Sequence, residues 1–183
     1  MNDVRTVKLP YGDGYGNRGA TELEPVYGTV ASVYRKLRAC GGTAKLALAC
    51  AKTNARFAEL HKAGLVRLSY VPDETGADLS WLDQTAEQMG IDEHSWSATV
   101  KRESTRASED GVYGVVGEYR VDPCEDWETG DSVWGFIGDD GRDLGGYATD
   151  VLDVTMNALE KAQEDTCPTC HRPNRAEGPY GHA

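Results

Sequence analysis

Apolar residues recur every three or four positions in the first third of the chain, a period typical of amphipathic helices. The pattern over residues 26–37 predicts a first helix that has Pro25 in its first turn and ends at the glycine pair 41–42. Thr43 can cap a second helix that runs to about Lys62, because a threonine side chain accepts hydrogen bonds from the first free backbone amides. The chain therefore opens with two helices.

Apolar and polar residues then alternate, which is typical of half-buried strands. The pattern predicts strands at residues 65–71, 96–102, 112–121 and 133–137, with loops at 103–111 and 122–131. The run at 133–137, VWGFI, lacks polar side chains, so we expect a central strand covered on both faces. Gly114 and Gly117 predict a bulge or a close backbone approach.

A short helix at 79–89, capped by Asp78, and a last helix at 150–164 complete the elements. Their order lacks regular alternation of strands and helices, so we predict an α+β fold. It has an antiparallel sheet of about four strands with helices packed on one face, two of them N-terminal and one C-terminal. We divide the chain into a glycine-rich arm (1–20), one domain (21–165, basic to residue 72 and acidic after it) and a Cys/His tail (166–183).

Composition is consistent with one domain in a reducing compartment. The chain has 183 residues, of which 39% are hydrophobic and 27% charged, enough to form a core. No apolar run is long enough to span a bilayer, and the first ten residues contain no hydrophobic signal segment. Five cysteines are an odd number, which disfavours a secreted disulfide scaffold. We therefore expect a cytoplasmic protein without a membrane partner.

Charge is divided unevenly along the chain. Residues 1–72 contain 11 Lys/Arg and 5 Asp/Glu, a net charge of +6, whereas residues 73–166 contain 6 and 24, a net charge of −18. The whole chain has a net charge of −11. Such a balance attracts basic partners and repels nucleic acid. A simpler interpretation is that the charges keep the protein soluble. The sequence is also compatible with a homo-oligomer.

The acidic segment supplies the candidate partner-binding residues. They are the carboxylates and one tryptophan of two predicted loops: Asp122, Glu125, Asp126, Trp127, Glu128, Asp131, Asp139, Asp140 and Asp143. Trp127 is the expected interface anchor, because aromatic residues are enriched at binding hot spots. Carboxylates gathered on one surface would suit a non-enzymatic protein that docks on a basic host protein, as a nucleic-acid mimic or an inhibitor of host defence.

Two cysteines and two histidines in the tail form a candidate zinc knuckle. Cys167 and Cys170 have the spacing with which two thiolates reach one tetrahedral ion, and His171 and His182 could complete the site. Cys124 is another candidate for the fourth ligand. The alternative is a tail with free thiols, so a structural zinc is the one cofactor that the sequence suggests.

An alternative function comes from residues 43–71, which resemble winged-helix DNA-binding regulators. That resemblance implies a recognition helix with Asn54 and Arg56, and phosphate contacts from Lys45 and Lys52. Residues 35–62 would then contact nucleic acid directly. One straight helix is the simpler interpretation, because no glycine or proline interrupts residues 43–62.

Catalysis has little support. Neither Gly-x-Ser-x-Gly nor His-Glu-x-x-His occurs, and no pair of carboxylates is singled out. We therefore expect a protein that is not an enzyme and has no catalytic residues.

Two blocks resemble small proteins of actinobacterial phages and mobile elements. They are RLSYVPDETGADLSWLDQ at 67–84 and DSVWGFIGDDGRDLGGYATDVLDVTMNAL at 131–159. That family has no established activity, so no residue role is transferred from it. The resemblance implies a phage protein that binds a host protein in the host cytoplasm, with a virion or assembly component as the alternative.

Overall fold

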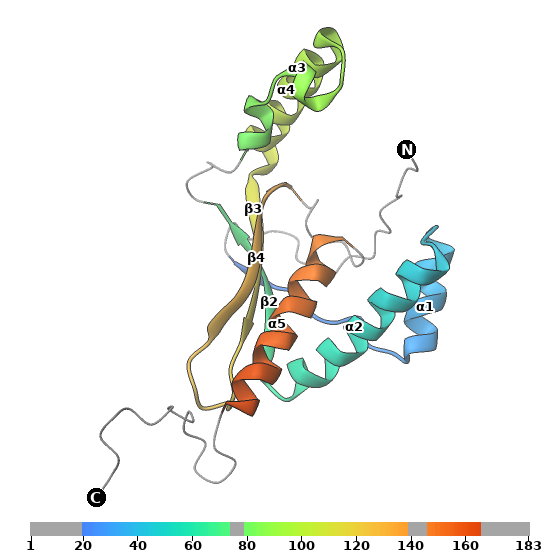
Figure 1. The fold of residues 1–183 in the computed structure, drawn as a ribbon, viewed down its shortest axis with the longest axis vertical. Helices are drawn as coiled ribbons and strands as arrows, with labels where there is room; N and C mark the ends of the chain where they lie inside the picture. Colours follow the sequence, from blue (N-terminus) through green and yellow to red (C-terminus); the bar gives the residue numbers. More distant parts are fainter. Residues whose placement is uncertain (1–19, 74–78, 139–145, 166–183) are drawn as a thin grey trace, which may run out of the picture.

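The computed structural model describes residues 20–73, 79–138 and 146–165, which form an α+β fold as predicted (Figure 1). Four antiparallel strands are arranged in the order β1-β2-β3-β4. The strands are β1 (Thr21–Glu22), β2 (Val66–Pro72), β3 (Val112–Tyr119) and β4 (Glu128–Ile137). The helices are α1 (Val30–Ala39), α2 (Ala44–Lys62), α3 (Ala86–Met89), α4 (Glu93–Asp110) and α5 (Tyr147–Glu164), with a 3-10 turn η1 at Ser80–Asp83.

Helices α2 and α5 cover one face of the sheet, and α1 packs on α2 (Figure 1). Val66, Leu68 and Tyr70 alternate along β2 and are at most 1% exposed, so this face of the sheet is the core face. Burying each such side chain contributes about 1.5–3 kcal/mol. The predicted arrangement of helices on one face is therefore confirmed.

Threonines begin the two N-terminal helices. The Oγ1 of Thr43 accepts a hydrogen bond from the Leu46 amide, which confirms the predicted start of α2. Thr29 caps α1, so this helix begins at Val30 and the predicted start near Pro25 is wrong. The residues before Thr29 lie outside the helix: Thr21 and Glu22 pair with β2, and the Leu23 amide bonds to the Leu68 carbonyl, 2.7 Å away.

Residues 96–102 and 103–111 were expected to form a strand and a loop, and both expectations are wrong. Residues 93–110 form the continuous helix α4, capped by Asp92 and ended by Gly111. Trp96 and Glu103, seven positions apart, are its two buried residues. Helical period therefore decides the burial of this segment, and the alternation of Trp96 with Ala98 and Val100 does not.

The strand expected at 133–137 is longer and less central than predicted. β4 begins at Glu128, inside the expected acidic loop, and the order of strands places it at an edge of the sheet. Only Ile137 of β4 is fully buried. Register shifts beside Gly114 and Gly117 of β3 confirm the predicted bulges.

Helices α3 and α4 project beyond the sheet, away from α1, α2 and α5 (Figure 1). The short helix predicted at 79–89 is divided into η1 and α3, and α3 is capped by Thr85. The predicted cap, Asp78, lies outside the described residues. None of the helices in the described ranges combines the length and hydropathy needed to cross a bilayer.

Candidate functional site

The loop between β3 and β4 carries most of the candidate acidic residues that the structure describes. Its backbone is held at several points. The Asp122 carboxylate accepts a hydrogen bond from the Cys124 amide at 2.8 Å, and the Asp122 carbonyl accepts one from the Glu125 amide at 2.9 Å. Such a side chain-to-backbone bond is typical of an Asx turn. The loop therefore has a defined turn at its start.

Arg120 ties this loop to the end of α2. Its Nε donates to the Gly64 carbonyl at 2.6 Å, and its backbone amide donates to the Leu65 carbonyl at 3.0 Å. A further Arg120 nitrogen lies 3.4 Å from the Glu125 carbonyl. The loop is thus attached to a second element of the core.

Two guanidinium groups contact the ring of Trp127. The Arg67 and Arg120 Cζ atoms are 4.4 Å and 4.3 Å from the centroid of its ring. Such cation–π contacts contribute about 0.5–1 kcal/mol each at exposed sites. Trp127, the predicted interface anchor, is therefore half-buried against its own chain, where it orders the acidic loop.

Arg67 is itself fixed by a two-pronged ion pair across the outer face of the sheet. Its Nε and one terminal nitrogen donate to the two oxygens of Glu118 at 2.7 Å and 2.9 Å. The hydrogen bond that Arg67 donates to Glu118 is the main reason why the pKa of Arg67 is raised above its usual value. A rigid guanidinium thus supports one face of the Trp127 ring.

Three exposed carboxylates lie in a short stretch of chain: Glu125 and Asp126 in the loop, and Glu128 at the start of β4. We call these three residues the acidic tip. Glu128 accepts a hydrogen bond from the Tyr119 hydroxyl at 3.0 Å, and burial, followed by this carboxylate, raises the pKa of Tyr119. The last turn of α5, with exposed Glu164, lies at the same end of the molecule (Figure 1).

The other predicted acidic residues do not join the acidic tip in the described part of the chain. Asp131 is half-buried on β4, opposite Gly117 of β3. The residues Asp139, Asp140 and Asp143 lie outside the described ranges. Gly138, the last described residue before them, is separated from Glu128 by the length of β4, about 30 Å. The described carboxylates therefore form one loop tip and not a long face.

The candidate DNA-contacting residues are divided between solvent and core. Lys45 and Lys52 are exposed. Asn54 is fully buried, and its side chain accepts from the Val26 amide at 2.9 Å and donates to the Val26 carbonyl at 2.8 Å. It therefore holds the chain before α1 and is not presented for contact with a base.

Arg56 also bonds to its own chain. It lies 2.5 Å from a carboxylate oxygen of Glu160 and donates to the Asn157 side chain at 3.1 Å. Both partners are on α5, so Arg56 links α2 to α5. Residues 44–62 form one continuous helix, as the simpler interpretation predicted.

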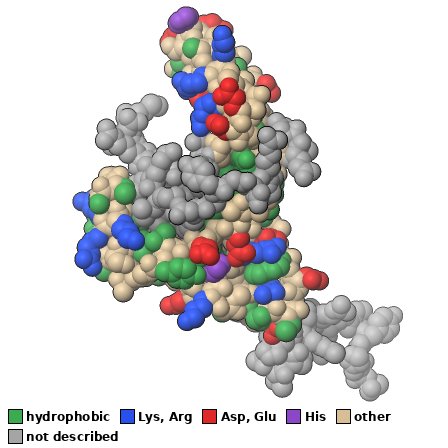
Figure 2. All heavy atoms as spheres, turned by 180° about the vertical axis from the view of Figure 1, so that it is seen from behind, with side chains coloured by type: hydrophobic (Ala, Val, Ile, Leu, Met, Phe, Trp, Pro, Cys, Tyr) green, Lys and Arg blue, Asp and Glu red, His purple; other side chains and the backbone are tan. Residues whose placement is uncertain are grey.

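Basic side chains that remain exposed gather around α1 and the start of α2. They include Arg35, Lys36, Lys45 and Lys52, and the sequence contains no acidic residue from 29 to 58. Figure 2 shows basic side chains on this lobe, at the left of the view. We call it the basic lobe. The start of α2 lies about 28 Å from its end, and Arg120 ties the acidic loop to the chain just after that end.

The zinc-knuckle candidates Cys167, Cys170, His171 and His182 lie outside the described residues. Cys124, the alternative ligand, is exposed in the acidic loop. Among residues 20–73, 79–138 and 146–165, no group of three or more His, Cys, Asp or Glu side chains is arranged to hold a metal ion.

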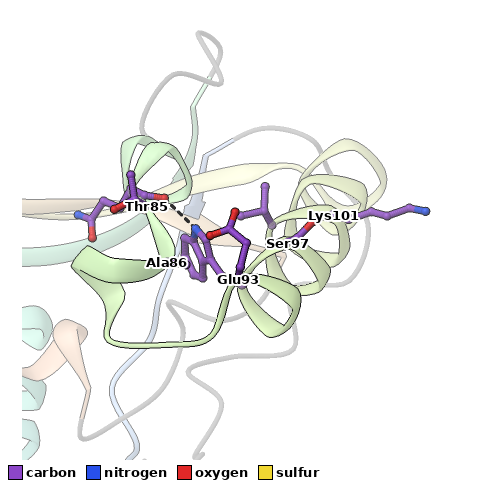
Figure 3. Close-up of a pocket in the computed structure, with 8 residues that line it drawn as sticks. Thr85, Ala86, Glu93, Ser97 and Lys101 are labelled. Atoms are coloured by element: carbon purple, nitrogen blue, oxygen red, sulfur yellow. Dashed lines mark hydrogen bonds between the residues drawn. The ribbon is translucent and has the colours of Figure 1, made fainter.

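A hollow of about 530 Å³ lies between α3 and α4 (Figure 3). It is lined by one carboxylate, Glu93, and one amine, Lys101, beside the buried Trp96. The indole Nε1 donates to the Gln84 carbonyl at 2.7 Å, which fixes the ring. The sequence analysis missed this hollow because it assigned residues 96–102 to a strand.

Comparison with known proteins adds no family to this description. No protein-family model, curated protein sequence or solved structure gives a significant match to the chain.

Proposed function

We propose that this protein is a non-enzymatic binding protein that docks its acidic tip on a basic surface of another protein. The single observation that carries the proposal is the presentation of Glu125, Asp126 and Glu128 on a loop ordered by the stack of Arg67, Trp127 and Arg120. A loop that is ordered before binding loses less conformational entropy when the partner arrives.

Charge determines which class of partner the acidic tip would attract. The net charge of −11 repels nucleic acid at a distance and attracts a surface rich in lysine and arginine. Arg67 is neutralised by its ion pair with Glu118. Arg120 donates to backbone carbonyls and keeps its charge, so it offsets one of the three carboxylates of the acidic tip and leaves a net charge of about −2 there. A host nucleic-acid-binding or defence protein has the kind of basic surface that fits.

The test compares two variants of equal charge. In the tip variant, Glu125→Gln, Asp126→Asn and Glu128→Gln remove three exposed carboxylates, while the control replaces the exposed Glu87, Glu93 and Glu109 of α3 and α4 by Gln. A lysine- and arginine-rich peptide serves as the probe, and its affinity is measured at low and high salt. We expect the tip variant to lose affinity at least tenfold more than the control, and the wild-type affinity to fall with salt. Equal losses in both variants would mean that net charge alone attracts the probe.

A second candidate function is nucleic-acid binding by the basic lobe. The observation that favours it is the absence of acidic residues from 29 to 58 together with exposed Lys45 and Lys52. Salt-dependent retardation of duplex DNA, lost on Lys45→Gln and Lys52→Gln, would support this function against the first. The exposed cations are few compared with the 6–10 phosphate contacts of strong binders, so we place it second.

A further inference from the structure

The outer edge of β4 is long and lacks a neighbouring strand in the described part of the chain. β4 has ten residues and is the last strand of the sheet, so its edge is about 30 Å long, with bulges at Gly130 and Gly135, which have no partner on β3. An edge of this length presents backbone N–H and C=O groups to any strand that approaches.

Apolar side chains flank this edge on both faces of the sheet. Trp134, on the outer face of β4, is 37% exposed. On the core face, Tyr147 and Val154 of α5 are 60% and 49% exposed. They account for three of the six large apolar side chains exposed in the described ranges.

Tyr147 and Val154 lie on the side of α5 that faces the β4 edge. The Tyr147 ring contacts Phe136 of β4 at a centroid distance of 5.5 Å, and Val154 follows it two helical turns later. Glu160, which bonds to Arg56 of α2, lies more than about 100° around the helix from both of these side chains. Tyr147 and Val154 are therefore exposed beside the free edge, with the exposed Asp150 between them on the same side of α5.

We propose that two copies of this chain associate through β4 in antiparallel pairing, with α5 packed against α5 of the second copy. A twofold axis through the edge would extend the four-stranded sheet to eight strands with the helices on the same side. Because α5 packs over both β3 and β4, a strand spacing of about 4.8 Å would bring the two α5 axes to about 10 Å. This is the distance at which helices pack.

The arrangement of charge on β4 permits this pairing. The regular stretch of β4 between its bulges, residues 131–134, contains one carboxylate, and pairing about Val133 does not place Asp131 opposite Asp131 of the second copy. Like charges directly opposite would destabilise the pair. An edge about 30 Å long and a width of about 20 Å, which is one sheet layer plus the diameter of α5, give roughly 600 Å² per copy, the lower end of the size range of specific interfaces. A lone peptide strand would leave Tyr147 and Val154 uncovered, which favours a second copy.

The first test is the mass of the full-length protein by sedimentation velocity, with a reductant and a chelator present so that thiols or a metal ion cannot link two tails. We expect a dimer at micromolar concentration for the wild type and a monomer for Val154→Glu. The matched control is Leu48→Glu on α2, because Leu48 is 43% exposed and distant from β4. It should remain a dimer. A monomeric wild type at its highest soluble concentration would overturn the proposal, as would a Val154→Glu dimer as tight as wild type.

The second test identifies the surface. Amide hydrogen exchange of residues 128–137 should slow as the wild-type concentration rises, and it should not change with concentration in Val154→Glu. A wild-type dimer without this protection pairs elsewhere and overturns the proposal. Failure of these dimerisation tests would not count against the proposed function. The exposed carboxylates Glu125 and Asp126 lie outside β4, and the peptide measurement does not require a dimer.

Discussion

Gly117 of β3 lies directly against the side chain of Thr155 on α5, with no room for a Cβ atom between them. An added Cβ would also come within 2.9 Å of Val151. Since Val151 and Thr155 are both buried, neither can move aside without shifting α5. The helix can approach the sheet this closely because residue 117 has no side chain.

Replacing Gly117 by Ala should therefore destabilise the protein. We expect a loss of about 1–3 kcal/mol, the usual effect of overpacking a core, measured as a shift of the urea midpoint. The control is the same change in a Thr155→Ala background, where the loss should be smaller because the nearest atom has been removed. Equal losses in both backgrounds would show that Thr155 is not the obstacle.

Replacing Thr155 by Val should stabilise the protein. Its Oγ1 is buried without a hydrogen-bond partner among the described residues. An unpaired buried hydroxyl costs free energy, so Thr155→Val should raise the free energy of unfolding by about 1 kcal/mol. Thr53→Val is the matched control and should lower it, because the Thr53 hydroxyl donates to Asp153 at 2.9 Å. The two denaturation midpoints should move in opposite directions, and a parallel loss would contradict this account of Thr155.

Asn54→Ala should cost about 2–4 kcal/mol of stability, because it removes two hydrogen bonds and leaves both backbone groups of Val26 unpaired. Lys52→Ala, two residues earlier on the exposed side of α2, should change stability by less than about 0.5 kcal/mol. Chemical denaturation of both variants measures the difference. A loss below about 1 kcal/mol for Asn54→Ala would mean that the chain before α1 is held by other contacts.

Trp127→Ala should loosen the loop that carries the acidic tip. The substitution removes two cation–π contacts, so we expect a stability loss of about 1–2 kcal/mol and faster amide exchange over residues 120–128. Trp127→Phe keeps an aromatic face and should fall between wild type and the alanine variant. Unchanged exchange in Trp127→Ala would show that the Asp122 turn and Arg120 order the loop without the ring.

Glu103 should make α4 sensitive to acid. Hydrogen bonds from Arg102, followed by Arg106, lower the pKa of this nearly buried carboxyl below its usual value of 4.5. A lowered pKa in the folded state means that the stabilisation is complete above the unfolded value and is lost as the pH falls through the folded value. Glu103→Gln should therefore be less stable than wild type at pH 7, and the difference should shrink at pH values below about 4. A difference that stays constant from pH 7 to 3 would contradict the ion-pair origin.

Element ends marked by strong local chemistry could be predicted from the sequence. Thr43 began α2 as expected, since the cap and the uninterrupted run of helix-forming residues agree. The α+β class followed from the order of the predicted elements, and the alternation of apolar residues predicted a strand at 65–71, which the structure has at 66–72. These features depend on neighbours in sequence, which is why the pattern reveals them.

Features that depend on distant contacts could not be predicted in the same way. α4 projects from the sheet and buries few residues, so its sequence shows only a weak helical repeat of apolar residues. The alternation of Trp96, Ala98 and Val100 with polar residues therefore suggested a strand. The Asp92 cap was the available signal. Likewise, the apolar run VWGFI suggested a central strand, whereas it lies on the edge strand β4, where Phe136 contacts Tyr147 of α5. The partners of Trp127, Arg67 and Arg120, come from the ends of two other strands. Only tertiary structure determines such partners.

Placing the basic lobe and the acidic tip at the two ends of α2 gives the molecule a permanent electric dipole moment. The peptide dipoles of α2 point in the same direction, with their positive end at the basic lobe. A protein with such a moment turns in the field of a charged surface before the two touch, so fewer random orientations are sampled. The rate constant for association with a cationic target should therefore exceed that of a molecule that has the same net charge distributed evenly over its surface.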